Sequence, residues 1–251
     1  MKIKTTRNYG VEELKIIVYG PSGSGKTSLA KTCKNSLVIS CEAGLLPLRN
    51  SEVDYINIME DDNGQQLPRT AEHIKDDGSL IHYSPRLAQL RDALDYLKTD
   101  DAKKKYDWVF LDSLTEIGQI LSESLKKNYP EAKMALPMWG EYAEKMRSLV
   151  KEFRDLSGFN VVLIALSSVE KDENSRRYQG IDVQGKISTQ MPALFDEVFY
   201  YHTYTEEGGG LKRVLITQPN EKVLAKDRSG SLDEFEEPNL SLIADKIRGS
   251  K

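Results

Sequence analysis

The chain has 251 residues, of which 39% are hydrophobic and 29% are charged, and its formal net charge at pH 7 is −4. A chain of this length buries enough surface to form one large α/β domain without disulfides. No apolar run approaches the roughly 18 residues of a membrane span, and residues 1–10 lack the apolar core of a signal peptide. We therefore expect a cytoplasmic protein with no membrane partner.

The cysteines and histidines are few and scattered. Cys33 and Cys41 fall within predicted core elements and have no metal-ligand spacing, so we expect buried thiols in a reducing compartment. His73, His82 and His202 form no cluster with them. This pattern disfavours a zinc site and a catalytic triad built on histidine.

The strongest signal is KIIVYGPSGSGKTSL, which spans residues 15–29. A predicted buried strand at 15–19 leads into a glycine-rich loop, and a helix is expected at 26–35. The loop fits G-x-x-x-x-G-K-[ST] at every fixed position, between the strand and the helix that a phosphate-binding P-loop requires. The predicted ATP-binding residues are Gly20, Pro21, Ser22, Gly23, Ser24, Gly25, Lys26, Thr27 and Ser28.

The residue types of this loop predict its chemistry. Glycines allow backbone conformations that other residues avoid, so successive N–H groups can surround an anion at a helix N-terminus. We expect Lys26 to reach the β- and γ-phosphates of ATP and to act in catalysis, and the Thr27 hydroxyl to bind Mg²⁺. The alternative is an ordinary glycine–serine turn before a helix.

Two later strands are expected to deliver carboxylates to the same edge of the sheet. The apolar run 36–40 is followed by Glu42, our candidate for the base that activates water against the γ-phosphate. The buried run 108–111 ends at Asp112, in the manner of a Walker B aspartate that holds Mg²⁺. A solvated loop residue is the alternative for Glu42. Glu116 is typical of a helix cap opened by Ser113 rather than of a catalyst.

The remaining core segments predict an open sheet with packed helices. Strands are expected at 54–59 and 160–166, and helices at 85–97, 113–127 and 139–156. The polar stretch 60–83 is expected to be a surface insertion, either a loop or a hairpin. Ser167 and Ser168 follow the last of these strands, where they would either contact the γ-phosphate or simply be polar residues at a strand end.

The segment 169–190 is charged and rich in loop-forming residues, so we expect a mobile loop. It combines Arg176, Arg177, Tyr178 and Lys186, which are types that bind phosphates and stack on bases. These four residues are our nucleic-acid candidates, and a solvated loop without a ligand is the alternative. After it, strands at 198–203 and 212–217 are expected to pair as an antiparallel hairpin. A short amphipathic helix is expected at 238–248, and no linker divides the single domain 1–251.

The order of these parts resembles the RecA-like ATPase core, and above all the short phage-encoded RecA-like nucleotide-binding proteins. Some of those act as single-strand-annealing recombination proteins. The runs DYLKTDDAKKKYDWVFLDSLTE, GKISTQMPALFDEV and AKDRSGSLDE carry the resemblance. It implies an α/β, RecA-like fold with a mostly parallel central sheet, helices on both faces and a C-terminal antiparallel hairpin.

The resemblance also implies site residues and partners. Glu42 falls at the catalytic glutamate and Asp112 at the metal aspartate of the family. Lys226 and Arg228 fall on the Lys-x-Arg pair that such proteins present to the nucleotide of an adjacent subunit, in a head-to-tail ring or filament. A surface turn with two solvated cations is the alternative for this pair. ATP, Mg²⁺, single-stranded DNA and a single-strand-binding protein are the implied ligands and partners, in the host cytoplasm if the chain is phage-encoded.

Two departures from the family pattern matter. Ser167, Ser168 and Val169 stand where related proteins often carry a histidine, which leaves the sensor role open. There is no separate DNA-binding domain, so any DNA contact must come from core loops. We expect a DNA-stimulated ATPase that acts in recombination, annealing or repair.

Several rival functions remain. A small-molecule P-loop kinase would use the loop 174–186 as a lid, and a non-hydrolysing ATP-binding scaffold is a third class. A GTPase is disfavoured because the base-reading motif Asn/Thr-Lys-x-Asp is missing. AAA-type ATPases are disfavoured because a helical lid should follow the core, and only about 30 residues follow Pro219.

Overall fold

The computed structural model describes residues 12–206 and 208–249, so residues 1–10, which lack the apolar core of a signal peptide, lie outside it. The strands are β1 (Lys15–Gly20), β2 (Ser36–Ser40), β3 (Asp54–Asn57), β4 (Ala71–Ile74), β5 (Leu80–Tyr83), β6 (Trp108–Asp112), β7 (Asn160–Lys171), β8 (Arg177–Ile181), β9 (Glu197–Thr205), β10 (Leu211–Ile216), β11 (Lys226–Asp227) and β12 (Phe235–Glu236). The α-helices are α1 (Pro85–Leu97), α2 (Asp100–Lys105), α3 (Leu114–Asn128), α4 (Ala135–Arg154), α5 (Ile187–Gln190) and α6 (Leu240–Arg248). Short 3₁₀ helices are η2 (Lys26–Thr32), η3 (Leu46–Leu48), η4 (Ala132–Met134) and η5 (Met191–Leu194).

A mostly parallel ten-stranded sheet forms the centre of the molecule. Its order is β12-β10-β9-β1-β7-β6-β2-β3, with β11 on β9 and β8 on β7. Strands β9, β1, β7, β6, β2 and β3 run parallel, whereas β10 pairs antiparallel with β9 and with β12. The expected fold class and its C-terminal antiparallel strand pair are therefore confirmed.

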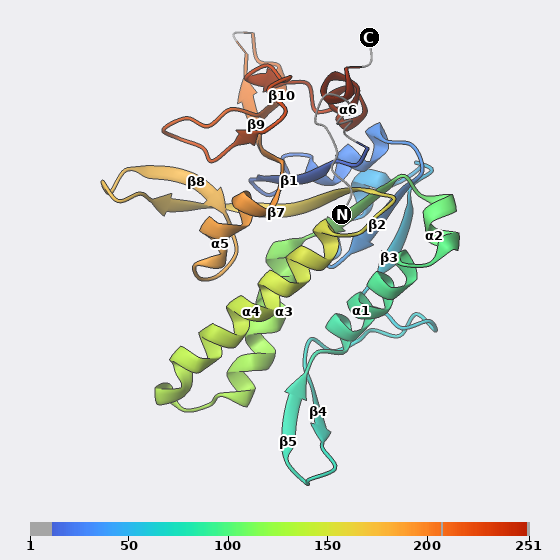
Figure 1. The fold of residues 1–251 in the computed structure, drawn as a ribbon, viewed down its shortest axis with the longest axis vertical. Helices are drawn as coiled ribbons and strands as arrows, with labels where there is room; N and C mark the ends of the chain where they lie inside the picture. The colour runs from blue at the N-terminus through green and yellow to red at the C-terminus, as the bar shows by residue number, and fades with distance from the viewer. Residues whose placement is uncertain (1–11, 207, 250–251) are drawn as a thin grey trace, which may run out of the picture.

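Alternating side chains along the strands divide the interior into two hydrophobic cores. Ile17 and Tyr19 of β1 join the core on the side of α1, α3 and α4, whereas Ile16 and Val18 join the core on the side of η2 and α6. Figure 1 shows α1, α3 and α4 on one side of the sheet and α6 on the other. Because both faces are covered, the parallel strands are continuous apolar runs, as expected for such sheets.

The register aligns the carboxyl ends of the central strands. Gly20 pairs with Leu166 of β7, and Ser40 pairs with Asp112. The loops that follow β1, β2 and β6 therefore emerge at one edge of the sheet, where open α/β sheets bind their ligands. We call this the carboxyl edge.

Most helix boundaries lie close to the sequence-based expectation. α1 begins after Ser84, whose hydroxyl accepts from the Leu87 amide. α3 begins after Ser113, whose Oγ accepts from the Glu116 amide at 3.3 Å, while the Glu116 carboxylate binds Arg69 instead of closing a capping box. α2 was not expected from the sequence, and α4 begins four residues earlier than the expected residue 139.

The helix after the P-loop is shorter than expected and is a 3₁₀ helix. It ends at Thr32 instead of Asn35, since the Cys33 backbone is already extended. Asn35 has a φ of 49°, a left-handed conformation that no right-handed helix can contain. The chain therefore turns there and enters β2 at once.

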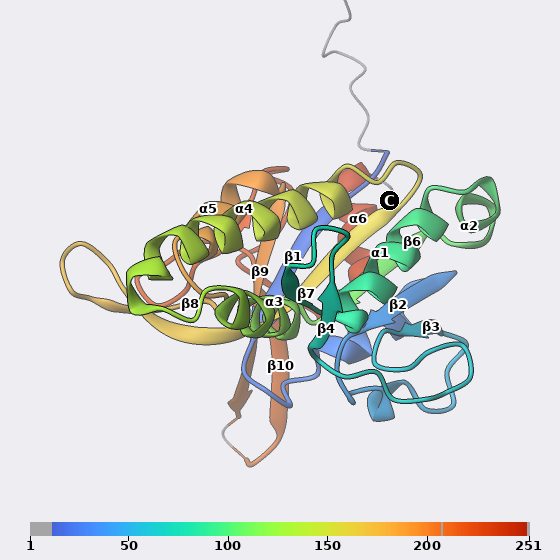
Figure 2. The same cartoon turned by 90° about the horizontal axis from the view of Figure 1, so that it is seen from below.

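Residues 60–83 contain the β4–β5 hairpin, a separate two-stranded sheet that extends beyond α1 and α3 (Figures 1 and 2). The side chain of Asn128 binds both the amide and the carbonyl of His82, at 2.7 and 2.8 Å. Arg69 pairs with Glu123 at 2.8 Å and also binds Glu116. These contacts fasten the hairpin and the segment before it to α3.

The expected loop at 169–190 is instead mostly regular structure. β7 continues to Lys171, β8 returns antiparallel to it, and α5 follows. Asp172 holds the turn between the strands by accepting from the amides of Asn174 and Arg176. Ser167 and Ser168 consequently lie inside a strand rather than at its end. Across residues 12–206 and 208–249, no helix combines the length and apolarity needed to cross a membrane.

Candidate nucleotide-binding site

The glycine-rich loop leaves β1 at the carboxyl edge and packs against β9. A Cβ on Gly20 would come within 2.6 Å of the Tyr201 carbonyl oxygen, so only glycine fits there. Gly23 and Gly25 have φ values of 72° and 114°, in the region that favours glycine. The loop therefore has the backbone that a phosphate cradle needs, with η2 starting directly after it.

Lys26 folds back over this loop and is only 7% exposed. Its ammonium donates to the carbonyls of Gly20 at 2.9 Å and Pro21 at 2.7 Å, and lies 3.4 Å from Ser24 Oγ. Burial lowers the pKa of Lys26 to about 8, while the nearby carboxylates of Asp112 and Glu42 act in the opposite direction. The site thus holds a single buried cation in contact with its own backbone.

Thr27 near the start of η2 contacts Asp112 at the end of β6. The Thr27 hydroxyl donates to Asp112 Oδ2 at 2.6 Å, and Asp112 is 7% exposed. Burial raises the pKa of Asp112, and the Thr27 hydrogen bond and the Lys26 charge oppose that rise. A hydroxyl and a carboxylate at one point are the hard oxygen ligands that Mg²⁺ prefers, so these residues fit a magnesium ion completed by phosphate and water.

Within residues 12–206 and 208–249, no larger cluster of metal-ligating side chains accompanies this pair. Among the residues that the structure describes, no group of three or more histidine, cysteine or acidic side chains could hold a metal ion. Cys33 and Cys41 are buried thiols, and burial raises the pKa of each. The protein therefore offers few ligands for Mg²⁺ at the P-loop, and Mg²⁺ usually retains several water ligands in such sites.

Glu42 lies at the same edge, two residues beyond the end of β2. The Cys41 amide donates to the Asp112 carbonyl at 2.7 Å, and this bond holds the loop after β2 beside the end of β6. The Ser40 hydroxyl binds the Glu42 carbonyl at 2.9 Å, and the half-buried Glu42 side chain is close enough to act on the pKa of Lys26. The structure thus brings Glu42, Asp112 and Lys26 together.

Two residues that sequence reasoning missed also touch the loop. Tyr201 lies on β9, and its hydroxyl would be 3.0 Å from a Cβ on Gly25, so this side chain packs against the glycine-rich loop. Arg213 of β10 donates through Nε to the Ser24 carbonyl at 3.1 Å. Neither residue had a sequence signal, because its position depends on β9 and β10 lying beside β1.

Lys226 and Arg228 lie at the opposite edge of the sheet. Lys226 pairs with Val198 and its neighbour Asp227 pairs with Glu197, at the start of β9, which is level with the start of β1. The two cations are thus separated from the P-loop by most of β1, roughly 13 Å of strand. Lys226 donates to the carbonyls of Pro192 at 3.0 Å and Phe195 at 2.5 Å. In the chain itself, this pair does not reach its own P-loop.

The four nucleic-acid candidates do not gather at one point. Arg176 pairs with Asp172 at 2.8 Å, and Lys186 is exposed before α5. Arg177 and Tyr178 lie on β8 and line a groove between the β7–β8 hairpin and β9. Only these two candidates therefore share a surface.

The two serines considered as sensors have other contacts. Ser167 hydrogen-bonds with the Tyr200 hydroxyl, and Ser168 donates to Glu170 Oε1 at 3.0 Å. Both side chains thus bind neighbours in or beside the β7–β8 hairpin.

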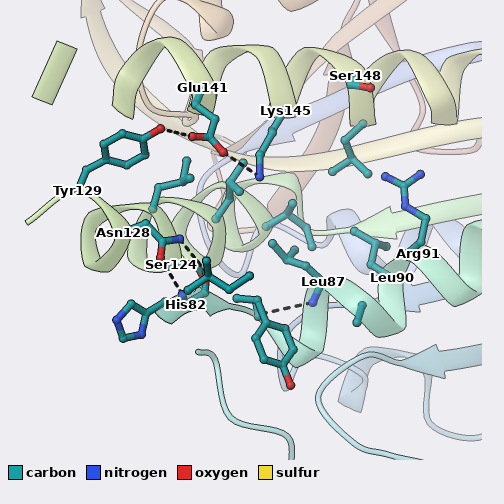
Figure 3. A pocket seen from close by; sticks show the side chains of 18 of the residues that line it. His82, Leu87, Leu90, Arg91, Ser124, Asn128, Tyr129, Glu141, Lys145 and Ser148 are labelled. Carbon is teal, nitrogen blue, oxygen red and sulfur yellow. Dashed lines mark hydrogen bonds and ion pairs between the residues drawn. The ribbon is translucent and has the colours of Figure 1, made fainter. Parts of the chain in front are cut away.

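A separate cavity of about 800 Å³ lies between α1, α3, α4 and the β4–β5 hairpin (Figure 3). Leucines such as Leu87 and Leu90 make much of its wall. Glu141 on its rim accepts from the Tyr129 hydroxyl at 2.5 Å and pairs with Lys145 at 2.9 Å. None of the predicted site residues lines this cavity, so it is distinct from the nucleotide site.

The solved structures that are similar to this chain include two archaeal proteins. The chain is 11% identical to the flagellar accessory protein FlaH from Methanocaldococcus jannaschii, over 88% of this chain and 83% of that one, with a TM-score of 0.40. It is 12% identical to the KaiC-like protein PH0186 from Pyrococcus horikoshii OT3, over 81% and 78% of the two chains, with a TM-score of 0.36. No curated protein matches the sequence.

A family model described as an AAA domain matches residues 12–229, which include the P-loop, Glu42, Asp112 and the Lys226–Arg228 turn. This match corrects the sequence-based expectation against AAA-type ATPases. The match covers most of the chain, and the protein therefore belongs to the AAA domain family.

Proposed function

We propose that the protein binds and hydrolyses Mg-ATP and acts on single-stranded DNA in recombination, annealing or repair. The observation that carries the ATPase part is the contact between Thr27 and Asp112 beside the buried ammonium of Lys26. A hydroxyl bonded to a buried carboxylate, beside a buried ammonium, suits an anion that binds together with Mg²⁺, as a nucleoside triphosphate does. The DNA part rests on the resemblance to RecA-like recombination proteins and on Arg177 and Tyr178 of β8.

Each residue of the site has a role in this proposal. The Lys26 ammonium exchanges its loop carbonyls for β- and γ-phosphate oxygens, and Thr27 and Asp112 hold the metal that neutralises charge on the phosphates. Glu42 orients a water for attack on the γ-phosphate. Lys226 and Arg228 lie at the far edge, so the exposed Arg228 would serve the nucleotide of a neighbouring subunit in a head-to-tail assembly, and Lys226 would hold the turn that carries it.

The deciding experiment measures ATP turnover with and without single-stranded DNA, alongside the mass of the assembly. The wild type should hydrolyse ATP, and single strands should raise the rate. Lys26→Ala should weaken ATP binding by at least about 100-fold, because the phosphates lose their buried cation. Lys104→Ala, on the exposed face of α2, is the matched control and should bind as the wild type does.

Two outcomes would overturn the proposal. If Lys26→Ala binds ATP with full affinity, the glycine-rich loop does not bind the phosphates as proposed. If single strands neither bind nor change ATP turnover at low salt, the proposed action on DNA is contradicted. That result would favour the kinase or scaffold alternative.

A further inference from the structure

A groove of about 430 Å³ opens at the carboxyl edge, between the β7–β8 hairpin, β9 and the turn after β10. Figures 1 and 2 show that the β7–β8 and β9–β10 hairpins diverge beyond the sheet on this side. The groove is lined by the aromatic residues Tyr178, Tyr200 and His202 and by the cations Arg177 and Lys222. Its volume lies within the range of sites that bind small organic ligands.

The aromatic rings form a row along β9. The ring centroids of Tyr200 and His202 are 6.0 Å apart with an interplanar angle of 28°, and those of His202 and Tyr204 are 5.9 Å apart with an angle of 17°. At the inner end, Tyr200 packs against Tyr19 of β1 at 5.2 Å. The outer end is Tyr204, which is 41% exposed. The row therefore leads from the core to solvent, and its outer rings, His202 and Tyr204, are the ones that a ligand can reach.

The charge of the lining is positive. Arg177 and Lys222 are both exposed, and none of the residues that line the groove is acidic. Three carboxylates lie beside this lining: Asp172 and Glu221 pair with Arg176, and Glu170 lies opposite Tyr178 in the β7–β8 hairpin. Cations and stackable rings together suit a ligand with flat bases and phosphates.

We propose that this groove binds unpaired nucleotides of a single-stranded nucleic acid, with bases stacked on His202 and Tyr204 beyond the buried Tyr200 and with phosphates near Arg177 and Lys222. The inference rests on the proposed action on single strands and says where they bind. It favours a strand over a free nucleotide because the row continues outward past the groove to Tyr204. Duplex DNA is excluded from such stacking, since its bases already stack on one another.

The same strand links the groove to the P-loop. Tyr200 and His202 face the groove, whereas Tyr201 between them faces the P-loop at Gly20 and Gly25. On β10, Val214 pairs with His202, and the adjacent Arg213 binds the Ser24 carbonyl. A nucleotide stacked on β9 would thus restrain the strand that also supports the phosphate cradle. The groove therefore offers a physical path by which a bound strand raises ATP turnover.

The test measures binding of labelled oligothymidylate to the full chain at low salt by fluorescence anisotropy. His202→Ala and Tyr204→Ala should each weaken binding by about 5- to 150-fold, the range for the loss of one stacked base. Tyr204→Phe keeps the ring and should bind within about twofold of the wild type. Tyr55→Ala is the matched control, because Tyr55 is 59% exposed on β3 at the far side of the sheet.

The cations have a separate readout. The double variant of Arg177→Ala and Lys222→Ala should reduce the slope of log affinity against log salt by about 0.7 for each phosphate that the protein no longer neutralises. Lys104→Ala should leave this slope unchanged. Groove variants should also lose stimulation of ATP turnover at limiting DNA while their basal turnover stays at the wild-type level.

The outcomes separate this inference from the proposed function. A wild type that binds no oligothymidylate overturns both. A wild type that binds, with His202→Ala and Tyr204→Ala binding equally well, overturns the groove and leaves the DNA function standing. Free thymidine monophosphate that displaces the strand at a matching nucleotide concentration would show that the groove takes single nucleotides, and it would overturn the assignment to a strand.

Discussion

Two lysines at opposite edges of the sheet make the same kind of contact but have different roles: one is expected to bind a ligand and the other supports the fold. Lys26 at the carboxyl edge donates to the carbonyls of Gly20 and Pro21. Lys226 at the other edge donates to the carbonyls of Pro192 and Phe195. Burial lowers the pKa of both ammonium groups. Hydrogen bonding alone therefore does not distinguish a ligand-binding lysine from a structural one.

The surroundings distinguish them. Lys26 bonds to its own glycine-rich loop and lies near Asp112 and Glu42, so its partners can be exchanged when a phosphate enters. Lys226 instead joins β11 to the η5 turn. Beside it, Arg228 is exposed and pairs with Asp196 on the surface, an interaction that costs little to break. Of the two residues expected to act in trans, Arg228 is thus the one placed to reach a neighbour, and Lys226 supports its turn.

The largest effect that would test this difference is the loss of Arg228. Arg228→Ala should lower ATP turnover by on the order of 10³–10⁵, the range for arginine fingers, with little change in ATP affinity. Steady-state turnover and nucleotide binding by the assembled protein check this. Lys226→Met should mainly lower the free energy of unfolding, because the carbonyls of Pro192 and Phe195 lose their donor.

Action in trans has its own control. Mixing Arg228→Ala with Glu42→Gln subunits creates interfaces that contain one intact Glu42 and one intact Arg228, and turnover should recover to on the order of a quarter of the wild-type value. Verified mixed assemblies that remain inactive would contradict action of Arg228 in trans.

The second prediction concerns the carboxyl edge. Glu42→Gln should bind Mg-ATP normally and lower turnover by about 10²–10⁴, because the amide cannot accept the proton of the attacking water. Rapid-quench measurement of phosphate release checks this, with Glu173→Gln in the β7–β8 turn as the matched control. Near-normal turnover would mean that Glu42 is only a loop residue.

The carboxyl edge was the part of the molecule most open to prediction. The apolar runs before Glu42 and Asp112 indicate parallel strands, and parallel strands end at the same edge. The segment after Leu166 was harder, because the strand continues to Lys171 without an apolar run, held by pairing with β8 alone. The role of Arg213 could not be predicted from the sequence, because its contact with Ser24 depends on β10 lying over the P-loop. The contacts of Lys226 with the Pro192 and Phe195 carbonyls likewise depend on the tertiary structure and could not be predicted from the sequence.

A third prediction concerns the stability of the edge that carries Arg228. Glu197 is 1% exposed and hydrogen-bonded to Asp227, and burial together with that carboxylate raises its pKa to about 8. The folded state therefore keeps a proton that the unfolded chain loses near its ordinary value of 4.5, so the free energy of unfolding falls as pH rises between these values. Glu197→Gln should reduce this fall by on the order of 1–3 kcal/mol in urea titrations. Identical pH profiles for the variant and the wild type would refute a neutral Glu197.

The smallest expected effect is a proton taken up when ATP binds at the other edge. With its pKa lowered to about 8, Lys26 in the free protein is mostly neutral at pH 9, whereas bound phosphates favour the ammonium. Mg-ATP binding at pH 9 should therefore take up more than half a proton, and the affinity should fall by up to about tenfold for each pH unit above 8. Calorimetry in two buffers of different ionisation enthalpy measures this uptake. Because the Glu42 carboxylate supports the charged form, Glu42→Gln should move the onset of uptake to lower pH, and Glu173→Gln should leave it in place. Binding without proton uptake in any of these proteins would mean that Lys26 stays charged despite its burial.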